Sequence, residues 1–167
     1  MGGCDTPSEP AEPVPFEHDG GTLALWHLAE GSGQTAFDVT FGHVHLQLGS
    51  SGVGDAQDPA WIADSHLGSG LAFAAGDDAY AVNAIWRTFQ TNEMSVDLWF
   101  RATTPAGHLF ELAPEVCALG WGGATFFFRI DDGATAHTAS ITDATVLALL
   151  TDGLWHYLAA TYDGTTR

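Results

Sequence analysis

The sequence predicts an all-β protein in which antiparallel strands form a sandwich or a jelly roll. Turn sequences such as Asp-Gly, Gly-Ser-Gly and Gly-Asp-Asp recur from Gly20 onward, and each is typical of a tight turn. The segments between them are short and rich in Thr, Val, Phe, Trp and Tyr, some of the residues that strands favour. Because strands do not alternate with long helical patterns, a parallel α/β sheet is not expected.

The turn sequences divide the chain into candidate strands. In chain order these are Thr22–Leu28, Val44–Leu48, Gly70–Ala74, Ala79–Asn83, Met94–Arg101, His108–Leu112, Thr125–Ile130, Thr138–Thr142 and Trp155–Tyr162. We expect Leu71–Phe73 and Tyr80–Val82 to form a hairpin across the Gly-Asp-Asp turn. The segment Asp143–Leu150 fits a short helix, a strand or a 3₁₀ turn.

Two of these strands have informative side-chain patterns. In the first, Met94, Val96, Leu98 and Phe100 alternate with Ser95, Asp97, Trp99 and Arg101. A period of two predicts a strand with one face toward the core. Trp155–Tyr162 is apolar on both faces, which predicts a central strand.

The composition fits one globular domain with a short tail. The chain has 167 residues, of which 46% are hydrophobic, and it contains no apolar run of about 18 residues that could span a membrane. It has 21 acidic residues against 4 arginines, no lysine, and a formal net charge of −17. This balance argues against nucleic acids and against anionic lipid surfaces as partners. It is compatible with binding of hard cations such as calcium.

Residues 1–19 have the composition of a disordered leader or tether. Four prolines, Pro7, Pro10, Pro13 and Pro15, follow Gly2-Gly3-Cys4 and are interspersed with glutamates. Such a segment is expected to be extended and to contribute nothing to a core. Cys4 is a candidate lipidation site at the start of a mature bacterial lipoprotein. The same residues also fit eukaryotic dual acylation, and they fit a chance cysteine in a disordered leader.

Residues 20–167 form the expected domain, whose end is abrupt. The segment Tyr162–Arg167 reads as the end of a strand, a turn and the opening of another strand. We therefore expect a domain truncated at its C-terminus.

The domain resembles the laminin-G-like, concanavalin A-like jelly-roll family in segments that follow one another in the family's order. Leu25–Asp38 is similar to the opening strand with its Glu-Gly-x-Gly turn and following Asp, and Gly68–Val82 to the family's hairpin. Met94–Phe100 is similar to a strand containing Val-x-x-Trp, and Asp152–Gly164 to the Trp-His strand. The resemblance covers about residues 20–167. It departs at Val39-Thr40-Phe41-Gly42, where relatives usually have Ser-Gly-Asn-Gly.

The resemblance implies a jelly roll of two antiparallel sheets, with Trp155 and Phe73 in the core. It also implies a calcium site at the rim of the sandwich, with Asp38, Asp77 and Asp78 as the candidate ligands. Calcium takes six to eight oxygen ligands, but an Asp-Asp pair is also ordinary turn chemistry. Zinc is a weaker alternative, because His43 and His45 lie on one face of a strand and His66 could add a third nitrogen.

Glycoside hydrolysis is the sharpest enzymatic hypothesis, because jelly-roll glucanases share this architecture. The nearest acidic pair is Glu93 and Asp97. Four residues along a strand span about 13 Å, whereas the two catalytic carboxyls of glycosidases lie roughly 5–9.5 Å apart. Asp97 fits better as a solvent-facing residue or a partner of Arg101. Cys117 has no neighbouring His or Lys to activate it, so we expect no enzyme activity.

Exposed aromatic residues could bind a glycan by stacking on its sugar rings. Trp61, Trp86 and Trp121 lie in loop-like stretches and are the candidate platforms, although each could instead cap the core. The sequence thus predicts an extracellular or cell-surface recognition module that binds a glycan or a surface protein, with calcium as a possible cofactor. One alternative is a structural or interaction domain of a larger surface protein without a small-molecule ligand, and another is a glycoside hydrolase.

Overall fold

The computed structural model describes residues 15–74, 79–81, 93–112, 116–131 and 135–164. The chain divides into two compact units, Met1–Asn83 and Ala84–Arg167, and each is described by itself. The strands pair antiparallel throughout the described residues, which confirms the all-β prediction. None of the helices within these residues has the length and apolar character needed to cross a membrane. Cys4, Asp77, Asp78 and Trp86 lie outside the described residues.

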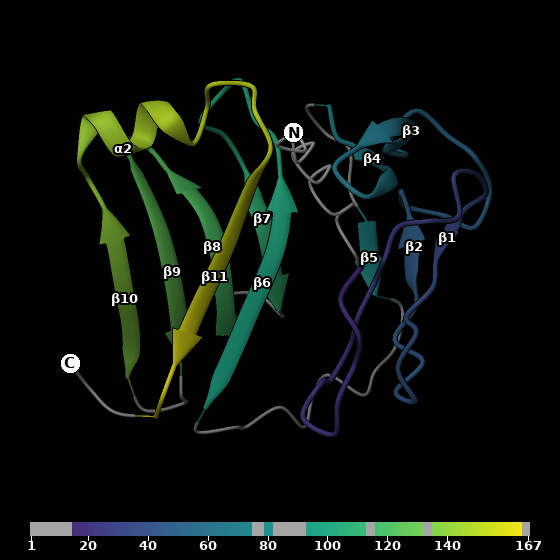
Figure 1. Ribbon diagram of the computed structural model, residues 1–167, viewed down its shortest axis with the longest axis horizontal. Coiled ribbons are helices and arrows are strands. Elements are labelled where there is room, and N and C mark those ends of the chain that lie inside the picture. Colours follow the sequence, from purple (N-terminus) through teal and green to yellow (C-terminus); the bar gives the residue numbers. More distant parts are fainter. Residues whose placement is uncertain (1–14, 75–78, 82–92, 113–115, 132–134, 165–167) are drawn as a thin grey trace, which may run out of the picture. The chain divides into compact units, whose positions relative to one another are not determined.

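The first unit contains a small sheet and a hairpin (Figure 1). The sheet has the order β1-β2-β5, with β1 at Thr35–Ala36, β2 at Leu46–Leu48 and β5 at Ala79–Ala81. The hairpin joins β3, Ala60–Ser65, to β4, Gly68–Ala72.

Three sequence predictions for this unit are wrong. The expected hairpin between Leu71–Phe73 and Tyr80–Val82 is not found among the described residues, which omit Val82, because β4 pairs with β3 and β5 pairs with β2. The side chain of Phe73, expected in the core, is 56% exposed. Thr22–Leu28 is not a strand either, since its β pairing is limited to an isolated bridge between Trp26 and Asp38.

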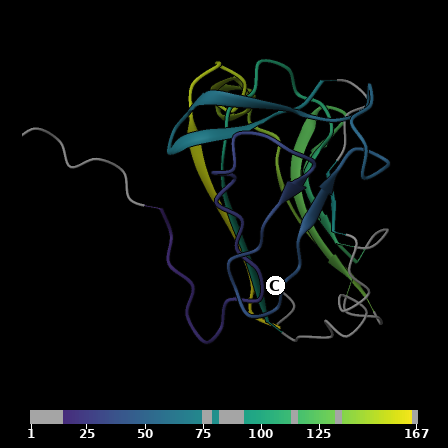
Figure 2. The same ribbon diagram turned by 90° about the vertical axis from the view of Figure 1, so that its right-hand side faces the viewer.

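The second unit has a four-stranded sheet, a two-stranded sheet and a short helix. The larger sheet has the order β10-β9-β8-β7, and the smaller one pairs β11 with β6. The strands are β6 at Met94–Phe100, β7 at His108–Leu112, β8 at Cys117–Gly122, β9 at Thr125–Asp131, β10 at Ala136–Ile141 and β11 at His156–Tyr162. Within this unit, Figure 1 and the turned view in Figure 2 show the two sheets as separate layers.

The core of the second unit lies between these two sheets. One cluster of buried residues consists of Phe100 of β6, Leu119 and Trp121 of β8, and Phe126 of β9, and a second consists of Leu112, Cys117 and Ile130. Half-buried side chains from β6, β7, β9, β10 and β11 and from the helix pack against the cluster that contains Trp121. Apolar side chains of both sheets therefore meet in this core, and those of β11 alternate with exposed residues along the strand.

The sequence left Asp143–Leu150 as a short helix, a strand or a 3₁₀ turn. The structure shows a helix, α2, at Ala144–Leu149. Asp143 caps its N-terminus, because its carboxylate accepts hydrogen bonds from the backbone N–H groups of Thr145 and Val146 at 2.8 and 3.1 Å. These bonds lower the pKa of Asp143, as expected where a carboxylate satisfies free N–H groups of a first turn. Leu147 and Leu150 pack against the core of the second unit.

Trp155–Tyr162 differs from its prediction in one respect. β11 alternates between half-buried and exposed residues, and within the described residues it pairs with β6 alone. The prediction of a central strand that is buried on both faces is therefore wrong. Consequently, one face of the β6–β11 pair lies toward the core and the other lies outward.

Candidate functional site

Trp121 is a core residue and not an exposed platform. It lies in β8, and its side chain is 6% exposed. Its ring packs edge-on against Phe100 and Phe126, with centroid distances of 5.9 and 5.0 Å. The prediction of a loop here is wrong because the flanking glycines serve close packing. A Cβ atom on Gly120 would lie 2.6 Å from the backbone of Gly107 and His108.

Trp61 also lies in a strand, β3, and not in a loop. Its side chain is half-buried, and its Nε1 atom donates a hydrogen bond to the carbonyl oxygen of Gly33 at 2.8 Å. The indole therefore ties β3 to the Gly31–Gly33 turn. Trp61 belongs to the first unit and Trp121 to the second.

Asp38 is a buried hydrogen-bond acceptor in the first unit. Its Oδ1 atom accepts from the N–H groups of Leu25 and Thr40 at 3.0 and 2.9 Å. Its Oδ2 atom accepts from Thr40 Oγ1 and the N–H of Val44, both at 2.8 Å. Burial acts to raise the pKa of Asp38, but these hydrogen bonds together outweigh it and lower the pKa. The carboxylate is thus occupied in closing the loop that contains it.

No group of three or more metal-ligating side chains occurs among the described residues. His43 and His45 are neighbours, with ring centroids 5.7 Å apart, but His45 Nδ1 accepts a hydrogen bond from the N–H of Asp38. His43, His45 and His66 therefore do not form a three-ligand zinc site in the part of the chain that the structure describes. Calcium binding that involves Asp38, Asp77 and Asp78 stays a prediction.

In the segment Phe37–Phe41 the polar side chains are buried and the large apolar side chains are exposed. Asp38 and Thr40 are each 4% exposed, whereas Phe37, Val39 and Phe41 are 51%, 43% and 90% exposed. Alternation along the chain places the polar residues inward, where the hydrogen bonds described above satisfy them. The apolar side chains consequently lie on the surface.

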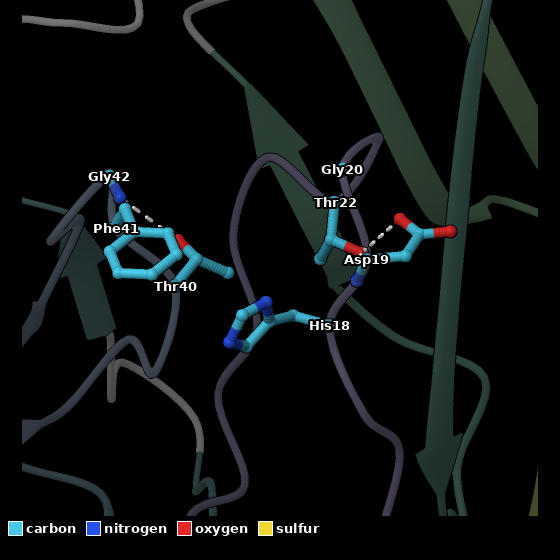
Figure 3. Close-up of a pocket in the computed structure, with 7 residues that line it drawn as sticks. All are labelled: His18, Asp19, Gly20, Thr22, Thr40, Phe41 and Gly42. Atoms are coloured by element: carbon cyan, nitrogen blue, oxygen red, sulfur yellow. Dashed lines mark hydrogen bonds between the residues drawn. The ribbon is translucent and has the colours of Figure 1, made fainter.

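A groove of about 450 Å³ lies beside Phe41 (Figure 3). The His18 ring packs edge-on against Phe41 at a centroid distance of 5.7 Å. The carboxylate of Asp19 turns toward Thr22 and away from Phe41 (Figure 3), and it accepts hydrogen bonds from Thr22 Oγ1 and the N–H of Gly21. Those bonds lower the pKa of Asp19. Because the Asp19 carboxylate is hydrogen-bonded within its own turn, Asp19 and His18 do not form an acid–base pair in this groove.

The outward face of the β6–β11 pair gathers aromatic and polar side chains from distant parts of the sequence. Tyr157 lies directly opposite Trp99, and Ala159 lies opposite Asp97. The Trp99 and Tyr157 rings are 5.4 Å apart at their centroids and inclined by 47°. Tyr157 is 46% exposed and Trp99 is half-buried. The two rings therefore form a shallow, angled aromatic surface.

Asp97 is linked to this aromatic pair by a hydrogen bond. The Tyr157 hydroxyl donates to Asp97 Oδ2 at 2.9 Å, which is a diagonal contact between the strands because Asp97 lies opposite Ala159. The bond to the carboxylate raises the pKa of Tyr157, since Tyr157 must stay protonated to donate. Tyr157 is thus held across the face in a defined orientation.

Arg101 and Trp155 extend the same face beyond the ends of the two strands. The Arg101 guanidinium carbon lies 5.0 Å from the centroid of the Trp155 ring, within the range of a cation–π interaction. Of the two alternatives predicted for Asp97, the solvent-facing one is confirmed, because Asp97 is exposed. Its carboxylate accepts from Tyr157, whereas Arg101 contacts Trp155. We call Asp97, Trp99, Arg101, Trp155 and Tyr157 the aromatic face.

The turn before β11 fixes the position of Trp155. The Asp152 carboxylate contacts His156 Nε2 at 2.9 Å and accepts from the N–H of Leu154 at 2.8 Å. The contact with His156 and the bond from Leu154 lower the pKa of Asp152. Gly153, with a φ of +81°, donates from its N–H to the carbonyl of Ala102 at 3.0 Å. This turn therefore holds Trp155 next to Arg101.

The sequence did not predict the aromatic face, although the pattern of one of its two strands indicates part of it. The alternation in Met94–Arg101 already puts Asp97, Trp99 and Arg101 on one side of a strand. The prediction that Trp155 lies in the core is wrong, because its side chain is only half-buried and packs against the exposed Arg101. The place of Tyr157 could not be read from the sequence, because the strand that contains it is apolar on both faces.

Comparisons of the chain with family models, with curated proteins and with solved structures find no match.

Proposed function

We propose that the protein is a non-catalytic recognition module that binds a glycan on the aromatic face. The observation that carries this proposal is the pairing of Trp99 and Tyr157 on the outward side of β6 and β11, next to Asp97. The apolar face of a sugar ring stacks on aromatic rings, while a few polar groups fix its orientation. The aromatic face supplies both kinds of contact.

The polar groups of the face are suited to sugar hydroxyls. Asp97 receives the Tyr157 hydroxyl on Oδ2, which leaves Oδ1 as an acceptor for a hydroxyl of the ligand. Arg101 is exposed and offers guanidinium donors next to Trp155. Ala159, opposite Asp97, has a side chain too small to cover the carboxylate.

A catalytic role is not part of the proposal. Asp97 is the only acidic residue in the sequences of β6 and β11, and glycoside hydrolysis requires two carboxyl groups on either side of the scissile bond. The glycosidase hypothesis therefore gains no support from this face.

The finer assignments made from the sequence remain part of the proposal. We infer that the antiparallel sheets belong to a laminin-G-like jelly roll at the cell surface or outside the cell, with Cys4 as a possible lipid anchor and calcium as a possible cofactor. The resemblance in sequence supports these assignments. The alternative is an interaction domain that binds another surface protein and no glycan.

A glycan array, probed in calcium and again in chelator, tests the proposal. We expect the protein to bind one class of glycan and Trp99→Ala to abolish that signal. Phe41→Ala is the matched control, because Phe41 is an aromatic residue that is 90% exposed but lies in the first unit. Loss of binding in chelator would support the calcium prediction. No binding by folded protein in either condition would contradict the glycan proposal and favour the interaction domain.

A further inference from the structure

The aromatic face carries no net charge. Asp97 is its only acidic residue and Arg101 its only basic one, and β6 and β11 contain no other residue with a permanent charge. The Arg101 guanidinium is 5.0 Å from the Trp155 ring, so part of its surface is turned toward an aromatic group. The face therefore lacks the clustered cations that bind sulfate or carboxylate groups strongly.

The protein as a whole is strongly acidic. Twenty-one Asp and Glu residues oppose 4 arginines in the whole chain, which has a formal net charge of −17. At low ionic strength such a field repels polyanions, and the repulsion declines as salt shortens the Debye length, which is about 10 Å at 0.1 M. A polycation, in contrast, is attracted to acidic surface anywhere on the protein and needs no particular site.

We propose that the aromatic face takes an uncharged, extended glycan chain and that the charge of the protein excludes polyanionic glycans from it. This inference rests on the proposed glycan-binding function and specifies the class of its ligand.

The shape of the face supports binding along a chain and not at its end. The outward residues from Ser95 to Arg101 extend over roughly 20 Å of strand. The aromatic face is part of the outward side of a two-stranded sheet. On this side Asp97 is exposed, and so are the neighbouring residues Ser95, Ala159 and Thr161. A surface of this length and openness can contact several successive sugar units, whereas recognition of a chain end requires an enclosing pocket.

Affinity electrophoresis with matched polysaccharides tests this inference. The probes are neutral glucan, mannan, galactan and xylan, each paired with its carboxymethylated derivative, and polyglucosamine as a polycation. At low salt we expect a neutral polymer to bind and its carboxymethylated derivative to bind at least about tenfold more weakly. High salt should leave binding of the neutral polymer unchanged. It should reduce the difference in affinity between the neutral polymer and its carboxymethylated derivative. Polyglucosamine should slow the migration of Trp99→Ala as much as that of the unmodified protein, because a polycation binds acidic surface outside the aromatic face. High salt should abolish this retardation of both proteins.

The outcomes separate this inference from the function on which it rests. If a carboxymethylated polymer binds at low salt as tightly as its neutral parent, and Trp99→Ala removes both interactions, the aromatic face is a glycan site but the neutral-ligand inference is wrong. If none of the neutral or anionic polymers, and no glycan on the array, binds the folded protein, the proposed function itself is wrong.

Discussion

Tyr157 of β11 donates a hydrogen bond to Asp97 of β6 at 2.9 Å, diagonally across the outward side of the two-stranded sheet. These residues are 60 positions apart in the sequence, so the contact depends on the register of the two strands. A shift of one residue would turn every side chain of β11 to the opposite side of the sheet. The bond therefore reports directly on the arrangement of the aromatic face.

The Asp97–Tyr157 hydrogen bond should be visible in the ionisation of Tyr157. Because the bond to Asp97 raises the pKa of Tyr157, Asp97→Ala should lower that pKa toward the ordinary value of 10.0. A raised pKa in the folded state means that the bond stabilises the fold below pH 10.0 and that this contribution is lost as the pH rises through the pKa of the folded state. NMR titration measures the shift, and Tyr157→Phe identifies the signal among the 3 tyrosines. An unchanged titration in Asp97→Ala would show that the bond does not form in solution.

Asp38 should be important for stability and more so at neutral than at acidic pH. Asp38→Ala removes an acceptor of four buried or half-buried hydrogen bonds and should lower the free energy of unfolding by about 2–4 kcal/mol. The pKa of Asp38 is lowered from 3.8, so its contribution is present above pH 3.8 and is lost as the pH falls through the lower pKa of the folded state.

Urea unfolding of Asp38→Ala and of the unmodified protein, at neutral pH and at progressively lower pH, measures this effect. The difference between the two proteins should decrease as the pH falls through the pKa of Asp38. Equal stability at neutral pH would mean that the carboxylate is not buried in this hydrogen-bond network.

Gly120 should not tolerate a side chain. Gly120→Ala places a Cβ atom 2.6 Å from backbone atoms of Gly107 and His108 and should cost about 1–3 kcal/mol of stability. Gly52→Ala is the matched control, because nothing lies within 4 Å of its Cβ position, and its effect should stay within about 0.5 kcal/mol. Thermal unfolding of both variants makes the comparison. Equal melting temperatures would contradict the close approach of β7 and β8.

Cys117 should be chemically inert in the folded protein. Its side chain is 1% exposed, and burial raises its pKa to about 11, so little thiolate forms at mildly alkaline pH. In Cys4→Ser, a thiol reagent should label Cys117 only after a denaturant is added. Rapid labelling of the native protein would show that β8 is accessible.

The sequence was sufficient to predict the strands whose side chains alternate. Met94–Phe100 appears within one residue of the predicted Met94–Arg101, since apolar residues on one face of a strand define both the strand and its buried side. His108–Leu112 also appears with its predicted bounds, although Leu109 and Phe110 are consecutive apolar residues. The sequence around Trp121 was misleading because glycines normally indicate a turn. Here Gly120 lies in β8, where β7 approaches too closely for any side chain. Such a requirement becomes apparent only when the neighbouring strand is known.

The candidate site was less predictable than the strands, because it depends on pairing between distant segments. No local pattern indicates that Tyr157 lies opposite Trp99, or that Arg101 packs on Trp155. Asp38 gives a second example. The resemblance made it a candidate calcium ligand, but the sequence did not show that its oxygens receive hydrogen bonds from Leu25, Thr40 and Val44. Which donors surround a carboxylate is a property of the folded chain.

The most direct test of glycan binding on the aromatic face is a titration of the neutral glycan selected in the array against single-residue variants, by isothermal calorimetry. We predict that Trp99→Ala and Tyr157→Ala each weaken binding roughly tenfold or more, because each removes one stacking surface. Trp121→Phe and Phe41→Ala should bind like the unmodified protein, since Trp121 lies in the core and Phe41 in the first unit. Unchanged affinity in both Trp99→Ala and Tyr157→Ala, with all variants folded, would contradict the assignment of glycan binding to the aromatic face.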